Sequence, residues 1–147
     1  MHHARHRQIH AMGAAIVERV RDAMREESAG SGAEQVSFVI RRLDNRECLG
    51  MASLEDADSV SPELGLWLKE SAHGQGFGRE VVAALVEWGH ANLGKGSFIY
   101  PVAIQNTASR RIAENLHGEI IGNRTNPKYD SVVYRIPFYE SPYSQFS

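Results

Sequence analysis

A glycine-rich loop between two apolar segments constrains the fold of this chain more than any other feature. Residues 63–86 read ELGLWLKESAHGQGFGREVVAALV. The apolar start predicts a strand, and the apolar positions after the loop, spaced by three and four residues, predict a helix. Gly74, Gly76 and Gly78 alternate, and the lack of a Cβ lets a ligand approach the backbone there. The loop amides can converge on an anion at the positive end of the helix. We therefore predict that this loop binds the pyrophosphate of a cofactor.

Composition limits the classes of protein that fit the chain. A length of 147 residues predicts one domain, which we place at residues 1–137, with a tail at 138–147. A net charge of -2 argues against an electrostatic nucleic-acid binder. The single cysteine fits a reducing compartment, and no apolar run reaches the roughly 18 residues that span a bilayer. We expect a cytoplasmic protein. His6 and His10 have no carboxylate or cysteine close by in sequence, so we expect no metal site.

Hydrophobic spacing predicts a mixed α/β sheet. Apolar residues recur every three or four positions from Ile9 to Met24, which predicts a helix over about 8–28. Further helices are predicted from the glycine loop to about Gly94 and over 107–116. The predicted strands are 36–42, 47–54, 64–69, 97–103, 119–122 and 131–136. This order implies parallel strands around the glycine loop and antiparallel hairpins elsewhere. Pro101 predicts a bulge or an edge position for its end of the strand.

Two well-known phosphate motifs do not fit the loop. The dinucleotide fingerprint GxGxxG would need a third glycine where Arg79 stands. A P-loop needs Gly-Lys followed by Ser or Thr, but the Gly94-Lys95 pair is followed by Gly96. Neither motif therefore explains the glycines.

The loop resembles that of the GNAT N-acetyltransferases, whose pattern is Arg/Gln-x-x-Gly-x-Gly/Ala. Here it reads HGQGFG at residues 73–78, with His73 in place of the usual Arg or Gln. Residues 102–109 (VAIQNTAS) resemble the strand and the Asn-x-x-Ser helix start that follow in the family, and RRIAENLHG resembles its next helix. The resemblance covers residues 36–137 and points to the ribosomal-protein-type branch. It implies a GNAT-like mixed sheet with flanking helices. The family has a strand before its first hairpin, whereas only a helix is predicted here, so we expect the first strand to be missing.

The resemblance implies acetyl-CoA as co-substrate. The backbone of residues 67–69 would pair with the pantetheine arm, and the amides of residues 74–78 would bind the pyrophosphate. Arg79 would add charge to the pyrophosphate site, or be a solvated residue of the first helical turn. Asn106 would bind a pantetheine amide, or cap the helix that follows it. The residues expected to bind the cofactor are Trp67, Leu68, Lys69, His73, Gly74, Gln75, Gly76, Phe77, Gly78, Arg79 and Asn106.

Acyl transfer to an amine also needs a proton acceptor, because only the neutral amine attacks. Strand alternation puts Glu63 on the same face as Gly65 and Trp67, beside the expected cofactor arm. We expect Glu63 to be the base or to position a water molecule. Glu55 and Asp56 are second choices.

Two donors complete the expected chemistry. The resemblance implies that the Leu68 amide stabilises the oxyanion and that Ser109 protonates the departing thiolate. Tyr100 and Tyr134 are alternative donors only if they face the cleft, and His117 is expected to interact with the end of a helix.

The predicted function is acetyl transfer from acetyl-CoA to a primary amine, on a protein N-terminus, a lysine or a small molecule. The alternatives are a non-catalytic CoA-binding protein, a transferase of another acyl group such as succinyl, and an interaction module that uses the aromatic tail. A missing first strand would leave a sheet edge unpaired, which predicts a homodimer.

Overall fold

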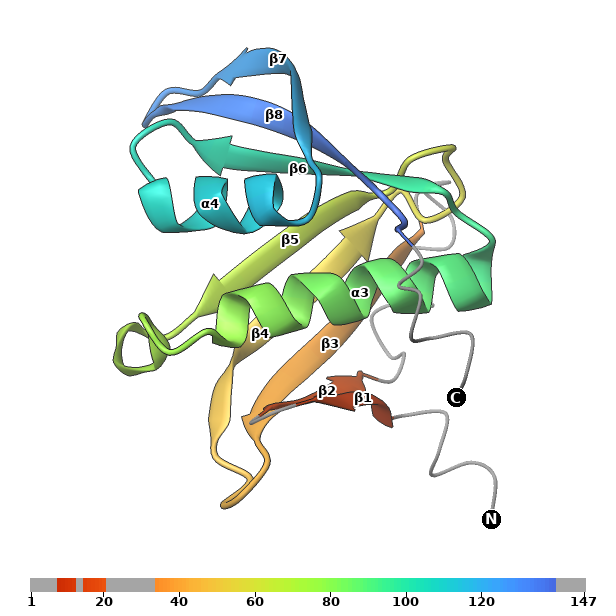
Figure 1. The fold of residues 1–147 in the computed structure, drawn as a ribbon, viewed down its shortest axis with the longest axis vertical. Coiled ribbons are helices and arrows are strands. Elements are labelled where there is room, and N and C mark those ends of the chain that lie inside the picture. Colours follow the sequence, from red (N-terminus) through yellow and green to blue (C-terminus); the bar gives the residue numbers. More distant parts are fainter. Residues whose placement is uncertain (1–7, 13–14, 21–33, 140–147) are drawn as a thin grey trace.

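The computed structural model describes residues 8–12, 15–20 and 34–139, which form a mixed sheet with helices (Figure 1). The sheet has eight strands in the order β1-β2-β3-β4-β5-β6-β8-β7. The strands are β1 (Gln8–Met12), β2 (Ala15–Arg19), β3 (Gln35–Arg42), β4 (Cys48–Glu55), β5 (Glu63–Leu68), β6 (Ser97–Ala103), β7 (Glu119–Thr125) and β8 (Asp130–Pro137). The helices are α3 (Phe77–Leu93), α4 (Thr107–Asn115) and the short 3-10 turn η2 (Glu70–Ala72). The predicted α/β class, the loop-to-helix order and the closing hairpin are confirmed.

The N-terminal part of the sheet corrects the prediction of a helix over 8–28. The described residues of that segment form β1 and β2, and β2 pairs with β3 from Ala15↔Arg42 to Arg19↔Phe38. Ala15, Ile16 and Val17 are each only 2% exposed, so three consecutive side chains are buried and the strand shows no alternation. The expectation of a missing first strand is therefore wrong, and the edge of β3 that motivated a homodimer is already paired. The rest of the predicted helix lies outside the described residues.

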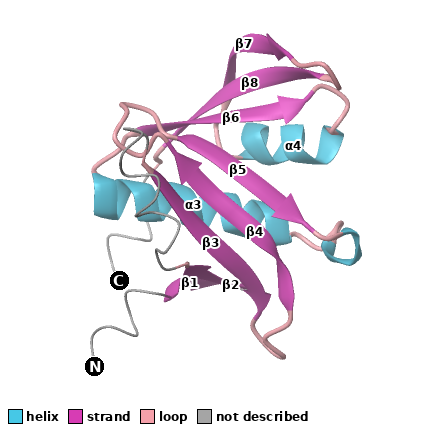
Figure 2. Ribbon diagram, turned by 180° about the vertical axis from the view of Figure 1, so that it is seen from behind, coloured by secondary structure: helices cyan, strands magenta, loops and turns pink. Residues whose placement is uncertain are grey.

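Helix α3 crosses one face of the sheet, as Figures 1 and 2 show from opposite sides. It begins after Gly76 and ends at Gly94, both in the left-handed region (φ 84° and 70°) that glycine adopts at little cost. Its buried face includes Val81, Val82 and Leu85, each fully or almost fully buried. A Cβ on Gly89 would lie 2.5 Å from the ring of Phe98, so the helix approaches β6 closely.

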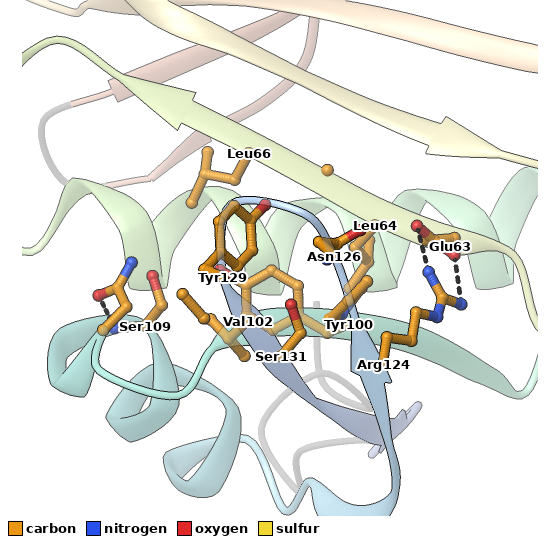
Figure 3. Close-up of a pocket in the computed structure, with 14 residues that line it drawn as sticks. Glu63, Leu64, Leu66, Tyr100, Val102, Ser109, Arg124, Asn126, Tyr129 and Ser131 are labelled. Carbon is orange, nitrogen blue, oxygen red and sulfur yellow. Dashed lines mark hydrogen bonds and ion pairs between the residues drawn. The ribbon is translucent and has the colours of Figure 1, made fainter.

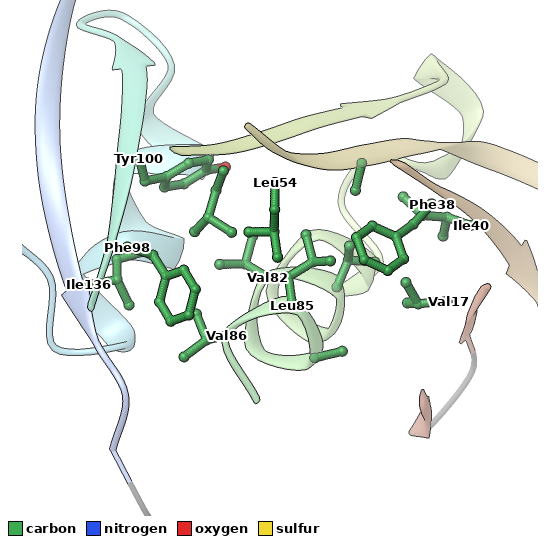
Figure 4. Packing of buried hydrophobic residues seen from close by; sticks show 14 of the residues in the cluster. Val17, Phe38, Ile40, Leu54, Val82, Leu85, Val86, Phe98, Tyr100 and Ile136 are labelled. Atoms are coloured by element: carbon green, nitrogen blue, oxygen red, sulfur yellow. The ribbon is translucent and has the colours of Figure 1, made fainter. Parts of the chain in front are cut away.

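The hydrophobic core lies between α3 and the sheet (Figure 4). Phe38 and Ile40 of β3 pack on one flank of the helix, and Phe98 of β6 packs on the other. Because the same helix contacts strands from both halves of the sheet, it fixes their relative positions where backbone pairing between them is short.

The backbone pairing between β5 and β6 is short. The two strands run parallel, and their register contains one pair, Glu63↔Ile99. The Ile99 amide donates to the Pro62 carbonyl at 2.9 Å, so the odd-numbered residues of β6 direct their backbone groups toward β5. Pro101 is the next odd residue, and it lacks an amide at the place where β5 has moved away. The prediction of an edge position for Pro101 is thus correct locally, although β6 lies inside the sheet.

Candidate active site

A pocket of about 440 Å³ opens where β5 and β6 separate (Figure 3). One wall is β5 and another is the end of β6 with the start of α4. The β7–β8 hairpin supplies the third wall. The lining residues are Glu63, Leu64, Gly65 and Leu66 from β5; Tyr100, Pro101, Val102, Ala103, Asn106 and Ser109 from β6 and α4; and Arg124, Asn126, Tyr129 and Ser131 from the hairpin.

The backbone of β5 directs hydrogen-bonding groups toward this opening, although the Leu68 carbonyl already accepts a hydrogen bond from the His73 ring. The Lys69 amide donates to the Leu49 carbonyl of the neighbouring strand at 2.8 Å. Hydrogen-bonded pairs alternate in an antiparallel ladder, so the odd-numbered residues of β5 bond to β4. Leu66 and Leu68 therefore direct their amides and carbonyls toward the gap. The expectation for residues 67–69 is corrected in part: Leu68 faces the gap, whereas the backbones of Trp67 and Lys69 are used by β4.

The glycine loop lies at the end of β5, next to this gap. Gly74 and Gly76 have φ of 75° and 84°, and a Cβ built on either would meet nothing within 4 Å. The first four amides of a helix have no partner within the helix, and here the first backbone bond of α3 runs from Glu80 to the Gly76 carbonyl. The His73 ring donates through Nε2 to the Leu68 carbonyl at 2.9 Å. The left-handed glycines and the helix start of the loop are thus present; residues 73–76 are exposed, whereas Phe77 and Gly78 are buried.

The expected base Glu63 makes a two-point ion pair with Arg124 of β7 (Figure 3). Arg124 Nη2 lies 2.9 Å from Glu63 Oε1, and Arg124 Nη1 lies 3.2 Å from Glu63 Oε2. The hydrogen bond that Arg124 donates to Glu63 raises the pKa of Arg124. Sequence reasoning missed Arg124, because the two residues are 61 positions apart and no local pattern joins them.

Asn106 and Ser109 lie at the start of α4, where both line the pocket. The Asn106 Oδ1 accepts a hydrogen bond from the Ser109 amide at 3.0 Å, so Asn106 is the helix cap that the sequence left as an alternative. Tyr100 also lines the pocket, and burial raises the pKa of its hydroxyl, although a hydrogen bond with the Ser109 side chain opposes that rise. The region beside the gap therefore carries two hydroxyl groups close together.

Comparison with known proteins identifies the family. Residues 2–119 match the model of the acetyltransferase (GNAT) domain. The chain belongs to the GNAT acetyltransferase family. A search of curated proteins found no match.

Solved GNAT structures share the fold at low sequence identity. The ribosomal-protein-S5-alanine acetyltransferase from Vibrio fischeri gives a TM-score of 0.72 at 10% identity, covering 87% of this chain and 95% of that chain. A putative ribosomal-protein-serine acetyltransferase from Vibrio cholerae gives 0.66 at 13% identity, covering 88% and 97%. Spermidine N-acetyltransferase from Vibrio cholerae gives 0.64 at 16% identity, covering 77% and 70%. At these identities the likeness establishes the fold alone.

Other predicted residues of this GNAT domain lie away from the pocket. The Trp67 side chain is 63% exposed, and the Lys69 side chain makes an ion pair with Glu47. Phe77 is 2% exposed and belongs to the core, so only its amide is available. Arg79 is exposed in the first turn of α3, and Gln75 donates to the Ser71 carbonyl at 2.7 Å.

Tyr134 and His117 have partners outside the pocket. The Tyr134 hydroxyl donates to Glu114 Oε2 at 2.8 Å and accepts from Arg110 Nε at 3.2 Å. The ring of His117 lies 4.5 Å from that of Tyr139. Neither residue lines the pocket, so neither is a donor there.

Two kinds of site are absent from the part of the chain that the structure describes. Among these residues, no three His, Cys, Asp or Glu side chains gather in a way that could hold a metal ion. None of the described helices has the length and apolar character needed to cross a membrane.

Proposed function

We propose that this chain transfers the acetyl group of acetyl-CoA to a primary amine by direct attack in a ternary complex. The observation that carries this proposal is the gap between β5 and β6, which share one backbone pair and then separate around the pocket, with the glycine loop following β5. An extended thioester arm fits such a gap, because it can take the place of the missing strand pairing. Membership of the GNAT acetyltransferase family supports the reaction class.

The residues present suit the diphosphate of CoA. Side chains at Gly74 and Gly76 would occupy the open space above the loop, and their absence leaves the amides accessible. The positive end of α3 favours a negative charge at the same place. We propose that the amides of residues 74–79 hold the pyrophosphate, that Arg79 adds charge from the surface, and that Leu66 and Leu68 bind the arm.

Donors in the gap suit the transfer step. Acetyl-CoA supplies the thioester carbonyl that the amine attacks. The Leu68 amide faces the gap and would stabilise the developing oxyanion, and Ser109 would donate a proton to the departing sulfur. The Asn106 side chain is fixed by its cap bond, which leaves its amide nitrogen free to donate.

The acceptor amine must be in its neutral form to react. An α-amino group has a pKa of about 8 and a lysine of about 10.4, so either must lose a proton before it attacks. Glu63 lines the pocket, and Glu55 of the neighbouring strand β4 has its Oε2 3.9 Å from a Cβ built on Gly65, another lining residue. The names of the structural neighbours give a ribosomal-protein alanine and spermidine as acceptors of those proteins. We propose for this chain the shared chemistry, a primary amine, as the acceptor class.

The test has two stages. In calorimetric titrations with acetyl-CoA, CoA and NADH, we expect binding of the first two and none of NADH. A thiol-release assay over peptide and small-amine acceptors then tests turnover. The proposal fails if acetyl-CoA does not bind. Tight binding without thiol release on any amine would instead favour a non-catalytic CoA-binding protein.

A further inference from the structure

We infer that Glu55, rather than Glu63, accepts the proton of the acceptor amine, and that Glu63 is a positioning residue that holds Arg124. This inference rests on the proposed acetyl transfer. In the register of β4 and β5, Glu55 and Glu63 stand directly opposite each other. Like charges in such a pair destabilise a sheet unless a cation compensates one of them.

Arg124 compensates only Glu63. Its guanidinium reaches from β7 and bonds both carboxylate oxygens, at 2.9 Å and 3.2 Å. A two-point bond of this kind is among the stronger charged contacts in proteins, and it fixes the direction of both side chains. Glu63 is thereby oriented toward the hairpin wall. Its part in the pocket is to hold β7 and β5 together.

Glu55 lacks such a compensating cation among the described residues. Among the described residues, no Lys or Arg makes an ion pair with it, and its one hydrogen-bond partner is the Ser53 hydroxyl at 3.5 Å. That distance is at the outer limit for a hydrogen bond. An amine that approaches Glu55 therefore has no cation to displace.

Gly65 connects Glu55 to the pocket. This glycine lines the pocket, and it follows Glu63 on the same face of β5. A Cβ at Gly65 would lie 2.7 Å from Ser53 Oγ and 3.9 Å from Glu55 Oε2, so both side chains lean over it. Because glycine has no side chain, β5 places no side-chain atom at position 65, between the Glu55 carboxylate and the pocket that Gly65 lines.

The proton balance of the step is complete with these groups. The ammonium form of the acceptor first loses one proton to water. As the neutral amine nitrogen then bonds to the thioester carbonyl carbon, it gives a second proton to a Glu55 oxygen. The carbon–sulfur bond breaks, and its electron pair stays on sulfur, which takes a proton from the Ser109 hydroxyl. Glu55 is exposed, so it returns its proton to water, and Ser109 regains one from water.

The test compares matched substitutions in the full chain with acetyl-CoA and the best amine from the acceptor panel. We expect Glu55→Gln to lower kcat by about a hundredfold or more, the range of a general base, with unchanged CoA affinity. Glu55→Asp should retain more activity than Glu55→Gln. Glu63→Gln and Arg124→Met should instead raise the KM for the amine with kcat within about tenfold. The double variant that combines Glu63→Gln with Arg124→Met should have a KM for the amine no higher than that of the more impaired single variant, because the two residues act as a pair.

Each other outcome overturns the inference. It is wrong if Glu63→Gln loses kcat while Glu55→Gln keeps it, or if neither change lowers kcat in an active enzyme. Calorimetric CoA binding by each variant shows that the fold is intact. If the unaltered chain turns over no amine at all, the proposed transferase function fails, and this inference fails with it.

Discussion

Gly76 is the residue at which backbone conformation and ligand chemistry meet most directly. Its φ of 84° is a left-handed value that few other residues adopt readily, and it directly precedes the first residue of α3. A Cβ built there would meet no atom within 4 Å, so the space around it is open to a ligand rather than filled by the protein. A substitution therefore tests ligand binding with little disturbance of packing.

We expect Gly76→Asp to weaken CoA binding at least tenfold, because it places a carboxylate against the proposed phosphate site. Gly76→Asn is the matched control, since Asn tolerates the left-handed region about as well and has nearly the same shape without the charge. Calorimetry on both variants measures the difference. Equal CoA affinities for the Asp and Asn variants would mean that a charge at residue 76 does not affect CoA binding, and would contradict a phosphate site at this loop.

Single residues of the site differ in how far the sequence predicts them. The glycine spacing is local, so Gly74 and Gly76 could be assigned from neighbouring residues alone. Arg124 could not be, because its pairing with Glu63 depends on how a distant hairpin folds over the gap. For Asn106 the sequence left two roles open, and the cap bond to the Ser109 amide is the one observed.

At the level of elements, the wrong prediction of a helix in the described part of residues 8–19 has a physical cause. Apolar residues at three- and four-residue spacing fit a helix, but a short strand whose side chains are buried on both faces does not need to alternate. Gly13 was the available counter-signal, because glycine inside a helix costs about 1 kcal/mol. The strands from β3 onward were easier to predict, since a turn sequence and glycines separate them.

The junction of β4 and β5 carries a pH-sensitive contact. Glu47, just before β4, pairs with Lys69, just after β5. The hydrogen bond and charge of Lys69 lower the pKa of Glu47 from its usual 4.5. A carboxyl whose pKa is lowered by folding stabilises the fold above its unfolded pKa, and that contribution is lost as the pH falls through the lowered value.

We therefore expect Lys69→Met to reduce the free energy of unfolding slightly at about pH 7 and by less at about pH 3, below the usual pKa of Glu47. The effect is small because both side chains are exposed to solvent. Denaturant titrations at the two pH values measure this difference in the free energy of unfolding. Lys95→Met is the control, because Lys95 makes no ion pair with the described residues. A deficit of equal size at both pH values would contradict this assignment.

For the whole molecule, the N-terminal strands complete the sheet. Strand β2 covers the edge of β3, and its buried Ile16 and Val17 are each 2% exposed. Burial of such side chains contributes roughly 1.5–3 kcal/mol each. This sum is a large part of the 5–15 kcal/mol by which domains are usually stable.

Removal of residues 1–20 should therefore lower the free energy of unfolding by about 3 kcal/mol or more and uncover an edge that pairs with other chains. Removal of residues 1–7, which leaves β1 and β2 in place, is the control. Chemical denaturation measures stability, and light scattering measures association. The role given to β2 is wrong if the longer deletion is as stable and as monomeric as the shorter one.

The single backbone pair between β5 and β6 has a mechanical consequence. Strands β1–β5 and strands β6–β8 form two plates that meet at Glu63↔Ile99 and are braced by α3. A molecule that bonded to both β5 and β6 across the gap would therefore join the two plates where their own backbone pairing is one residue pair long.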